Sequence, residues 1–128
     1  MKTSFYIASA LFTKTQKKRI NDIALKLRAR GHNVYVPHEL QIIGAENMPN
    51  AEWAKQVFKA DLQALDECDR VVYICEGMKG DIGAAWECGY AYAKGKEISI
   101  CEIGDLEKPI SLMVAQSCYS VHPFRYQS

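Results

Sequence analysis

Asp61 occupies a position where an acidic residue is not expected. On a helical wheel it falls in the middle of an apolar stripe that is expected to face the core. The other members of this stripe are Ala54, Val57, Phe58 and Leu65. Burial of an ionised carboxylate without a partner is very unfavourable, so we expect Asp61 to be paired, hydrogen-bonded or in contact with a wet cavity. The alternative is that Asp61 only caps a neighbouring loop.

Asp81 and Glu87 flank the start of another predicted helix. The helix carries a stripe of small residues, Ala84, Cys88 and Ala91, which allows its backbone to approach a sheet closely. Glu87 borders this stripe in the second turn, where the helix dipole favours a charged carboxylate, and Asp81 lies in the preceding loop. Both acids are therefore expected to face the ends of the strands. The alternative is that Asp81 is a helix cap and Glu87 a rim residue.

Converging carboxylates suit the chemistry of glycosidic bonds. One carboxylate can attack or stabilise an oxocarbenium-like centre while another delivers a proton to the leaving group. A Mg²⁺ site built from the same acids is the rival use, but the sequence supplies no further clear ligands and we expect no metal. The spacing of Gly77, Gly80 and Gly83 matches neither GxGxxG nor a Walker A loop, so we expect no dinucleotide cofactor.

Short apolar runs alternate with helical patterns along the chain and must position these acids. We expect strands at residues 4–10, 33–36, 70–75, 97–102 and 119–122. We expect helices at residues 50–67, 83–94 and 110–116, and one that begins at the Thr13/Gln16 capping-box pattern and ends near Gly31. Residues 38–49 carry neither period and form a long irregular loop.

This alternation predicts an α/β fold. The expected architecture is a single doubly wound, flavodoxin-like or Rossmann-like parallel sheet of about five strands with helices on both faces. In such a sheet a ligand binds at the carboxyl ends of the strands, near the point where the strand order reverses. Residues that follow the strands are therefore the candidates for a site.

Composition limits the class of protein. The chain has 128 residues, of which 48% are hydrophobic and 24% charged, so one globular domain over residues 1–128 is expected. A formal net charge of +1 argues against dedicated nucleic-acid or membrane binding. The five cysteines form no CxxC pair, and no apolar run reaches the length of a membrane span. These features favour free thiols and a cytoplasmic protein.

Several segments, in order along the chain, resemble the nucleoside 2-deoxyribosyltransferase family. They are Tyr6 with Phe12, Pro37 with Gln41, Trp53 through Asp61-Leu62, Asp81 through Glu87-Cys88-Gly89-Tyr90-Ala91, and Lys108-Pro109-Ile110-Ser111-Leu112-Met113. The resemblance implies transfer of a 2-deoxyribosyl group between nucleobases in nucleoside salvage. It also implies a dimer-based homo-oligomer whose small-molecule partners are deoxynucleosides and free nucleobases.

The resemblance also implies roles for individual residues. Glu87 would be the nucleophile that forms a covalent glutamyl intermediate, and Tyr6 would orient it. Asp61 would handle the proton on the base, and Asp81 would hold a sugar hydroxyl. The expected substrate-binding residues are Phe12, Gln41, Trp53, Ser111 and Met113.

Ser111 departs from the family pattern, which commonly has Asn before Leu-Met to bind the sugar 5′-hydroxyl. A small residue there resembles the related 2′-deoxynucleoside 5′-monophosphate N-glycoside hydrolases, which makes such a hydrolase the second hypothesis. Asp81 argues against it, because hydrolases that accept a 5′-phosphate usually lack this acid. A third hypothesis is a non-catalytic nucleoside-binding module on the same fold.

Overall fold

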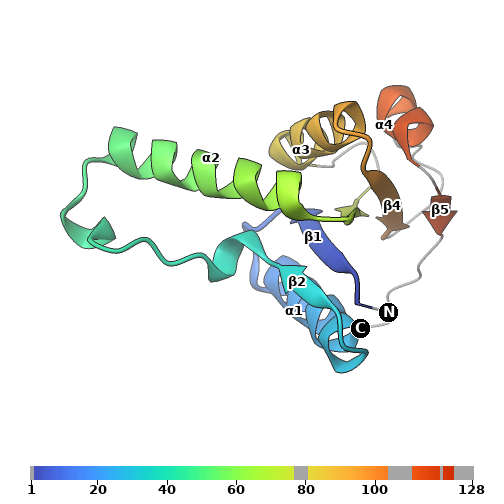
Figure 1. Ribbon diagram of the computed structural model, residues 1–128, viewed down its shortest axis with the longest axis horizontal. Coiled ribbons are helices and arrows are strands. Elements are labelled where there is room, and N and C mark those ends of the chain that lie inside the picture. The colour runs from blue at the N-terminus through green and yellow to red at the C-terminus, as the bar shows by residue number, and fades with distance from the viewer. Residues whose placement is uncertain (1, 77–80, 104–110, 119, 123–128) are drawn as a thin grey trace.

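The computed structural model describes residues 2–76, 81–103, 111–118 and 120–122, and it confirms the predicted α/β class (Figure 1). The strands are β1 (Ser4–Ser9), β2 (Asn33–Tyr35), β3 (Arg70–Cys75), β4 (Glu97–Glu102) and β5 (Ser120–His122). The helices are α1 (Lys14–Ala29), α2 (Asn50–Glu67), α3 (Ile82–Ala93) and α4 (Leu112–Ser117). Ile110 and Tyr119, the expected first residues of the last helix and strand, lie outside the described residues.

The segment predicted to be irregular contains two short 3-10 turns, η1 (Pro37–Glu39) and η2 (Ala45–Asn47). Gly44 precedes the second turn with a φ of 79°, a left-handed conformation that glycine adopts without strain. The segment leads from the end of β2 to the start of α2 (Figure 1).

The five strands form one parallel sheet in the order β2-β1-β3-β4-β5. In the register, Tyr6 of β1 lies opposite Tyr35 of β2 on one side and Val71 of β3 on the other. The chain moves outward from β1 to β2 and then returns to the far side of β1, so the strand order reverses between β1 and β3. The carboxyl ends of these two strands are therefore where a ligand is expected.

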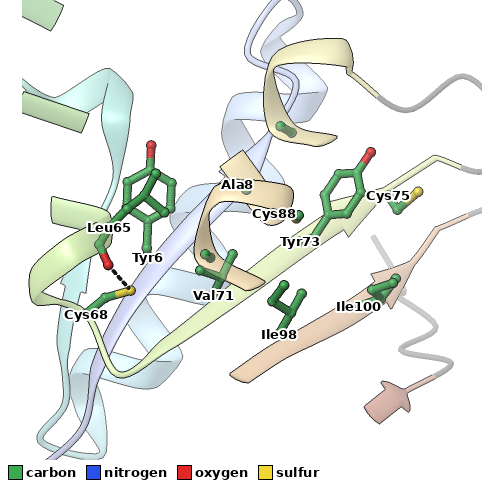
Figure 2. Close-up of a cluster of buried hydrophobic side chains, with 12 residues drawn as sticks. Tyr6, Ala8, Leu65, Cys68, Val71, Tyr73, Cys75, Cys88, Ile98 and Ile100 are labelled. Carbon is green, nitrogen blue, oxygen red and sulfur yellow. Dashed lines mark hydrogen bonds between the residues drawn. The ribbon is translucent and has the colours of Figure 1, made fainter. Parts of the chain in front are cut away.

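Helices cover both faces of the sheet because successive side chains of each strand point in opposite directions. Tyr6 and Ala8 belong to a buried cluster on the face that α2 and α3 cover, and Figure 2 shows this cluster. Ile7, between them in the sequence, packs instead with Ile20 and Ile23 of α1. β1 is thus buried on both faces, which explains its continuous apolar sequence.

The capping box predicted at the start of α1 is present. Thr13 Oγ1 accepts a hydrogen bond from the Gln16 backbone N–H at 3.1 Å, and Gln16 Oε1 accepts one from the Thr13 N–H at 3.0 Å. The helix ends before Gly31, whose φ of 89° is left-handed and permits the chain to turn into β2.

The apolar stripe of α2 is not continuously buried, which corrects the expectation that it faces the core throughout. Leu65 is 1% exposed, whereas Phe58 is 53% exposed and Ala54 is also exposed. The reason is visible in Figure 1, where the amino-terminal half of α2 extends beyond the sheet. Only its carboxyl-terminal half packs on the strands.

The small stripe of α3 lies directly against the sheet. Ala84, Cys88 and Ala91 are each at most 1% exposed and pack with residues of β1, β3 and β4. Small side chains let the helix backbone approach the strands closely, as expected. None of the helices in the described segments is long and apolar enough to cross a membrane.

Replacement of Ala91 by Leu tests this close approach. Because Ala91 is fully buried, the larger side chain should lower the free energy of unfolding by about 1–3 kcal/mol through overpacking. The control is Ala93→Leu, at an exposed position of the same helix, which should change it by less than about 0.5 kcal/mol. Urea denaturation measures both variants; equal effects at the two positions would contradict the packing of α3.

Candidate active site

Glu87 lies beside the small stripe of α3, and its carboxyl group meets β1. The Tyr6 hydroxyl donates a hydrogen bond to Glu87 Oε2. Tyr6 is fully buried, and the two groups are held together by the close packing of α3 on β1. Loss of surrounding water raises the pKa of Glu87 from about 4.5 to about 7, because burial disfavours the charged form. The carboxyl group is therefore balanced between its two protonation states near neutral pH.

Asp61 is hydrogen-bonded, as its position on an apolar stripe required. The Tyr35 hydroxyl donates to Asp61 Oδ1 at 2.9 Å. Burial raises the pKa of Asp61, and the Tyr35 hydrogen bond partly opposes this by stabilising the carboxylate. The ring of Tyr35 stacks on that of Tyr6, with 5.3 Å between ring centroids and 15° between planes.

Asp81 is the N-cap of α3. Its Oδ2 accepts a hydrogen bond from the Ala84 backbone N–H at 2.9 Å. A Cβ at Gly83 would lie only 3.0 Å from the same oxygen, so the glycine leaves room for the carboxylate. Asp81 also lines the cavity described next, so it combines the capping position with the exposure to the strand ends that the sequence suggested.

A cavity of about 460 Å³ opens at the carboxyl end of β1, a volume suited to a small molecule. Its lining comes from segments that follow β1 and β2 and from α2 and α3: Ser9, Leu11, Phe12, Pro37, Phe58, Asp61, Leu62, Leu65, Asp81, Gly83, Trp86 and Glu87. Three carboxylates and no Lys or Arg occur among these residues. The cavity combines acids with apolar walls, an arrangement suited to a flat, largely apolar ring attached to a polar group.

Aromatic side chains form the mouth of the cavity. Phe58 of α2 contacts Trp86 of α3, with 5.6 Å between ring centroids, and Trp86 stacks on Tyr90 at 5.8 Å. Phe12 lies on the loop after β1 and is 82% exposed. These rings could pack against the faces of a planar ligand.

The loop that carries Phe12 is fixed by a small polar network. Gln16 Oε1 accepts from the Phe12 backbone N–H at 2.9 Å, while Gln16 Nε2 donates to Glu76 at 3.2 Å. Arg19 holds the same Glu76 oxygen at 2.7 Å. The end of β3 is thereby connected through α1 to the loop at the cavity mouth.

The structure brings some of the predicted site residues together. One cavity is lined by Phe12, Asp61, Asp81 and Glu87. The Tyr6 hydroxyl donates a hydrogen bond to Glu87. These residues come from β1, the loop after it, α2 and α3, so their convergence depends on the sheet order.

The other predicted site residues lie elsewhere. Trp53 is eight residues before Asp61 on α2, which places it about 12 Å away along the helix axis, and it does not line the cavity. Gln41 is exposed between the two 3-10 turns, and Ser111 is exposed at the start of α4. Met113 lines a separate hollow between α3 and α4. Their expected contacts with substrate therefore stay predictions.

Among the lining or supporting residues that sequence reasoning does not identify are Tyr35, Phe58 and Trp86. The sequence places Tyr35 in a strand and Phe58 on an apolar stripe, and its patterns give Trp86 no role. A signal existed for two of them: Phe58 precedes Asp61 by one helical turn, and Trp86 is adjacent to Glu87. Tyr35 had no comparable local signal, because its contact with Asp61 depends on how α2 crosses the sheet.

The acids of the cavity are not arranged as a metal site. In the described segments no group of three or more His, Cys, Asp or Glu side chains is placed to hold a metal ion. Two of the acids already accept hydrogen bonds from tyrosine hydroxyls, Asp61 from Tyr35 and Glu87 from Tyr6. The arrangement supports proton transfer and nucleophilic attack by carboxyl groups.

The sequence and the fold of this chain are similar to those of known proteins. The model of a family described as nucleoside 2-deoxyribosyltransferase matches residues 5–114. A solved 2-deoxyribosyltransferase from the psychrotolerant bacterium Bacillus psychrosaccharolyticus is 32% identical with a TM-score of 0.82, over 93% of this chain and 85% of that one. No curated protein matches the sequence significantly.

Two more distant structures share the fold. A CMP N-glycosidase from Clostridium botulinum is 23% identical with a TM-score of 0.66, over 98% of this chain and 90% of that chain. A conserved protein from Enterococcus faecalis V583 is 20% identical with a TM-score of 0.69, over 95% and 82% of the two chains. At these identities the likeness concerns the fold alone.

The raised pKa of Glu87 predicts a stability effect that depends on pH. Folded protein holds more protons than unfolded protein between about pH 4.5 and 7, so stability falls as pH rises through this window. Glu87→Gln removes the charge and should stabilise the fold by roughly 2–3 kcal/mol at about pH 8, and by about 1 kcal/mol or less at about pH 5. Urea denaturation at both pH values measures this difference.

The control is Glu46→Gln at an exposed position of η2, which should leave stability nearly equal to that of the unaltered protein at both pH values. A Glu87→Gln variant that is no more stable than the unaltered protein at about pH 8 would contradict the burial of a charged carboxylate at this position.

Proposed function

Because this chain belongs to the nucleoside 2-deoxyribosyltransferase family, we propose that it transfers the 2-deoxyribosyl group of a 2′-deoxynucleoside between nucleobases. The observation that carries the proposal is the Glu87 carboxyl group, which lines an apolar cavity and accepts a hydrogen bond from Tyr6. The family indicates an enzyme that acts on nucleosides. The transfer itself and its intermediate are the proposal.

In the proposed first step a Glu87 oxygen attacks C1′ of the nucleoside. A C–O bond forms, the C1′–N bond breaks, and its electron pair leaves with the base, which receives a proton from Asp61. In the second step a nitrogen of another base attacks C1′, releases Glu87 and returns a proton to Asp61. Two displacements give net retention of configuration at C1′.

The environment of each acid supports these roles. Glu87 has a pKa of about 7, so a substantial fraction is ionised near neutral pH, and the Tyr6 hydrogen bond orients the attacking carboxylate. Burial raises the pKa of Asp61, which favours a proton available for the leaving base. Asp81 is the proposed acceptor for a sugar hydroxyl, and the rings of Phe58 and Trp86 would pack on the base.

The proposal includes a homo-oligomer. Several large apolar side chains away from the sheet are exposed, among them Ile43 at 98%, Met113 at 79% and Trp53 at 45%. Exposed apolar side chains of this size favour association with another protein surface. No cofactor takes part in the proposed chemistry, since carboxyl groups alone supply the nucleophile and the proton.

The second candidate is an N-glycoside hydrolase that acts on deoxynucleoside 5′-monophosphates, and Ser111 is the feature that favours it. The charge of the cavity opposes it, because Asp61, Asp81 and Glu87 line the cavity and no Lys or Arg is among the described lining residues. A phosphate with about two negative charges would need cationic partners. A non-catalytic binding module is the third candidate, and the two hydrogen-bonded, partly buried acids count against it.

The products formed with and without a second base test the proposed reaction. Incubation of the protein with deoxyinosine and free adenine should give deoxyadenosine and hypoxanthine, because the covalent intermediate reacts with the acceptor base. Chromatography measures the products, and Glu87→Ala should abolish their formation. Release of hypoxanthine and free sugar at the same rate whether or not adenine is present would make the protein a hydrolase, and no release from deoxyinosine would contradict the proposed transfer.

The charge of the cavity predicts substrate preference at the 5′ position. Deoxyadenosine should be preferred over its 5′-monophosphate by at least about tenfold in kcat/KM, which needs only ~1.4 kcal/mol of differential transition-state binding. Steady-state kinetics with the two donors measures this ratio. A preference for the monophosphate, with release of free base into water, would identify the hydrolase instead.

A further inference from the structure

Two tyrosines on neighbouring strands each contact one acid of the cavity. Tyr6 on β1 and Tyr35 on β2 are partners in the strand register, and their rings are stacked. Tyr6 donates its hydroxyl hydrogen to Glu87, and Tyr35 donates its own to Asp61. The proposed nucleophile and the proposed proton donor are thus supported by the same kind of group from adjacent strands.

We propose that Tyr35 is a positioning residue for Asp61, which it holds in the orientation needed to exchange a proton with the base. The inference rests on the proposed function, because it gives Tyr35 a part in the step assigned to Asp61. It extends that function, since neither the sequence pattern nor the chemistry of the acids identified Tyr35.

The geometry assigns different tasks to the two oxygens of Asp61. Oδ1 accepts the Tyr35 hydrogen bond at 2.9 Å, so a proton carried by Asp61 belongs on Oδ2. Rotation of the carboxyl group would break this bond, and the stack on fully buried Tyr6 prevents the Tyr35 ring from following. One oxygen is therefore fixed while the other remains for the ligand.

The surroundings of Asp61 indicate what loss of the Tyr35 hydroxyl would do. In the described segments, Asp61 is linked to Tyr35 by a hydrogen bond and through that ring to Tyr6, and it shares the cavity lining with Asp81 and Glu87. Burial raises the pKa of Tyr35, so it stays a protonated donor. Its hydrogen bond lowers the pKa of Asp61, hence removal of the hydroxyl should raise that pKa.

Tyr35→Phe tests the proposal because it keeps the ring and its stack and removes only the hydroxyl. A carbon-13 NMR titration of the Asp61 carboxyl group, assigned with Asp61→Asn, should show its midpoint about 0.5 pH unit or more higher in the variant. The kcat for donors with poor leaving bases should fall about tenfold or more, with a smaller fall for good leaving bases and little change in KM.

The matched control is Tyr6→Phe, the same change on the neighbouring strand. It should move the titration of Glu87 instead and should lower kcat for all donors to a similar degree. An unchanged Asp61 titration in Tyr35→Phe, or a fall in kcat independent of the leaving base, would overturn the role of Tyr35.

A measurement on the unaltered protein covers the case in which Tyr35→Phe does not fold. The Cζ carbon of Tyr35, labelled with carbon-13, should shift with the same midpoint as the Asp61 carboxyl, and independence of the two signals would overturn the proposal. Failure of the proposed function would give a different result from failure of the role of Tyr35. If only the proposed function failed, the Tyr35 and Asp61 signals would titrate together while the protein released no base from any deoxynucleoside.

Discussion

The hydrogen bond from Tyr6 to Glu87 connects β1 to helix α3, which covers it, and the candidate site depends on this contact. It can form because α3 carries only small side chains, Ala84, Cys88 and Ala91, where it meets the sheet. A bulky residue in this stripe would lift the helix and carry the carboxyl group away from Tyr6. The same close packing removes water from Glu87 and raises its pKa. Packing and reactivity at this position therefore have one cause.

The second acid depends on the sheet in a similar way. Adjacent strands lie about 4.8 Å apart, so the register that pairs Tyr6 with Tyr35 places their rings in contact and their hydroxyl groups on the same side of the sheet. α2 crosses this side with Leu65 buried and Asp61 one turn earlier, within reach of Tyr35. The reversal of strand order next to β1 leaves the space that becomes the cavity. Two acids on separate helices are thus held by one pair of neighbouring strands.

Local patterns in the sequence were sufficient to predict the elements and the need of Asp61 for a polar partner. The capping box of Thr13 and Gln16 and the glycine after α1 are signals contained within a few residues, and the structure has both. An acid on an apolar stripe is also a local signal, and it indicated that Asp61 needed a partner. The identity of that partner could not be predicted, because Tyr35 meets Asp61 only through the sheet register and the path of α2.

The walls of the cavity were harder to predict for the same reason. Helical periodicity places Phe58 and Asp61 on one face of α2, and the family resemblance adds Trp53, but neither indicates where the helix leaves the sheet. The amino-terminal half of α2 extends beyond the strands, so Phe58 lines the cavity and Trp53 does not. Gln41, Ser111 and Met113 were expected from the family resemblance, and they lie on segments whose placement around the cavity no local pattern encodes.

The central claim is that Glu87 is a nucleophile, and its covalent intermediate can be detected directly. Protein mixed with a 2′-deoxynucleoside in the absence of an acceptor base, quenched and digested, should yield a peptide that contains Glu87 with the added mass of one deoxyribosyl group. Addition of adenine before the quench should remove the adduct, because the acceptor base releases the sugar. An adduct on another residue, or active protein that forms no adduct, would contradict the assignment of Glu87.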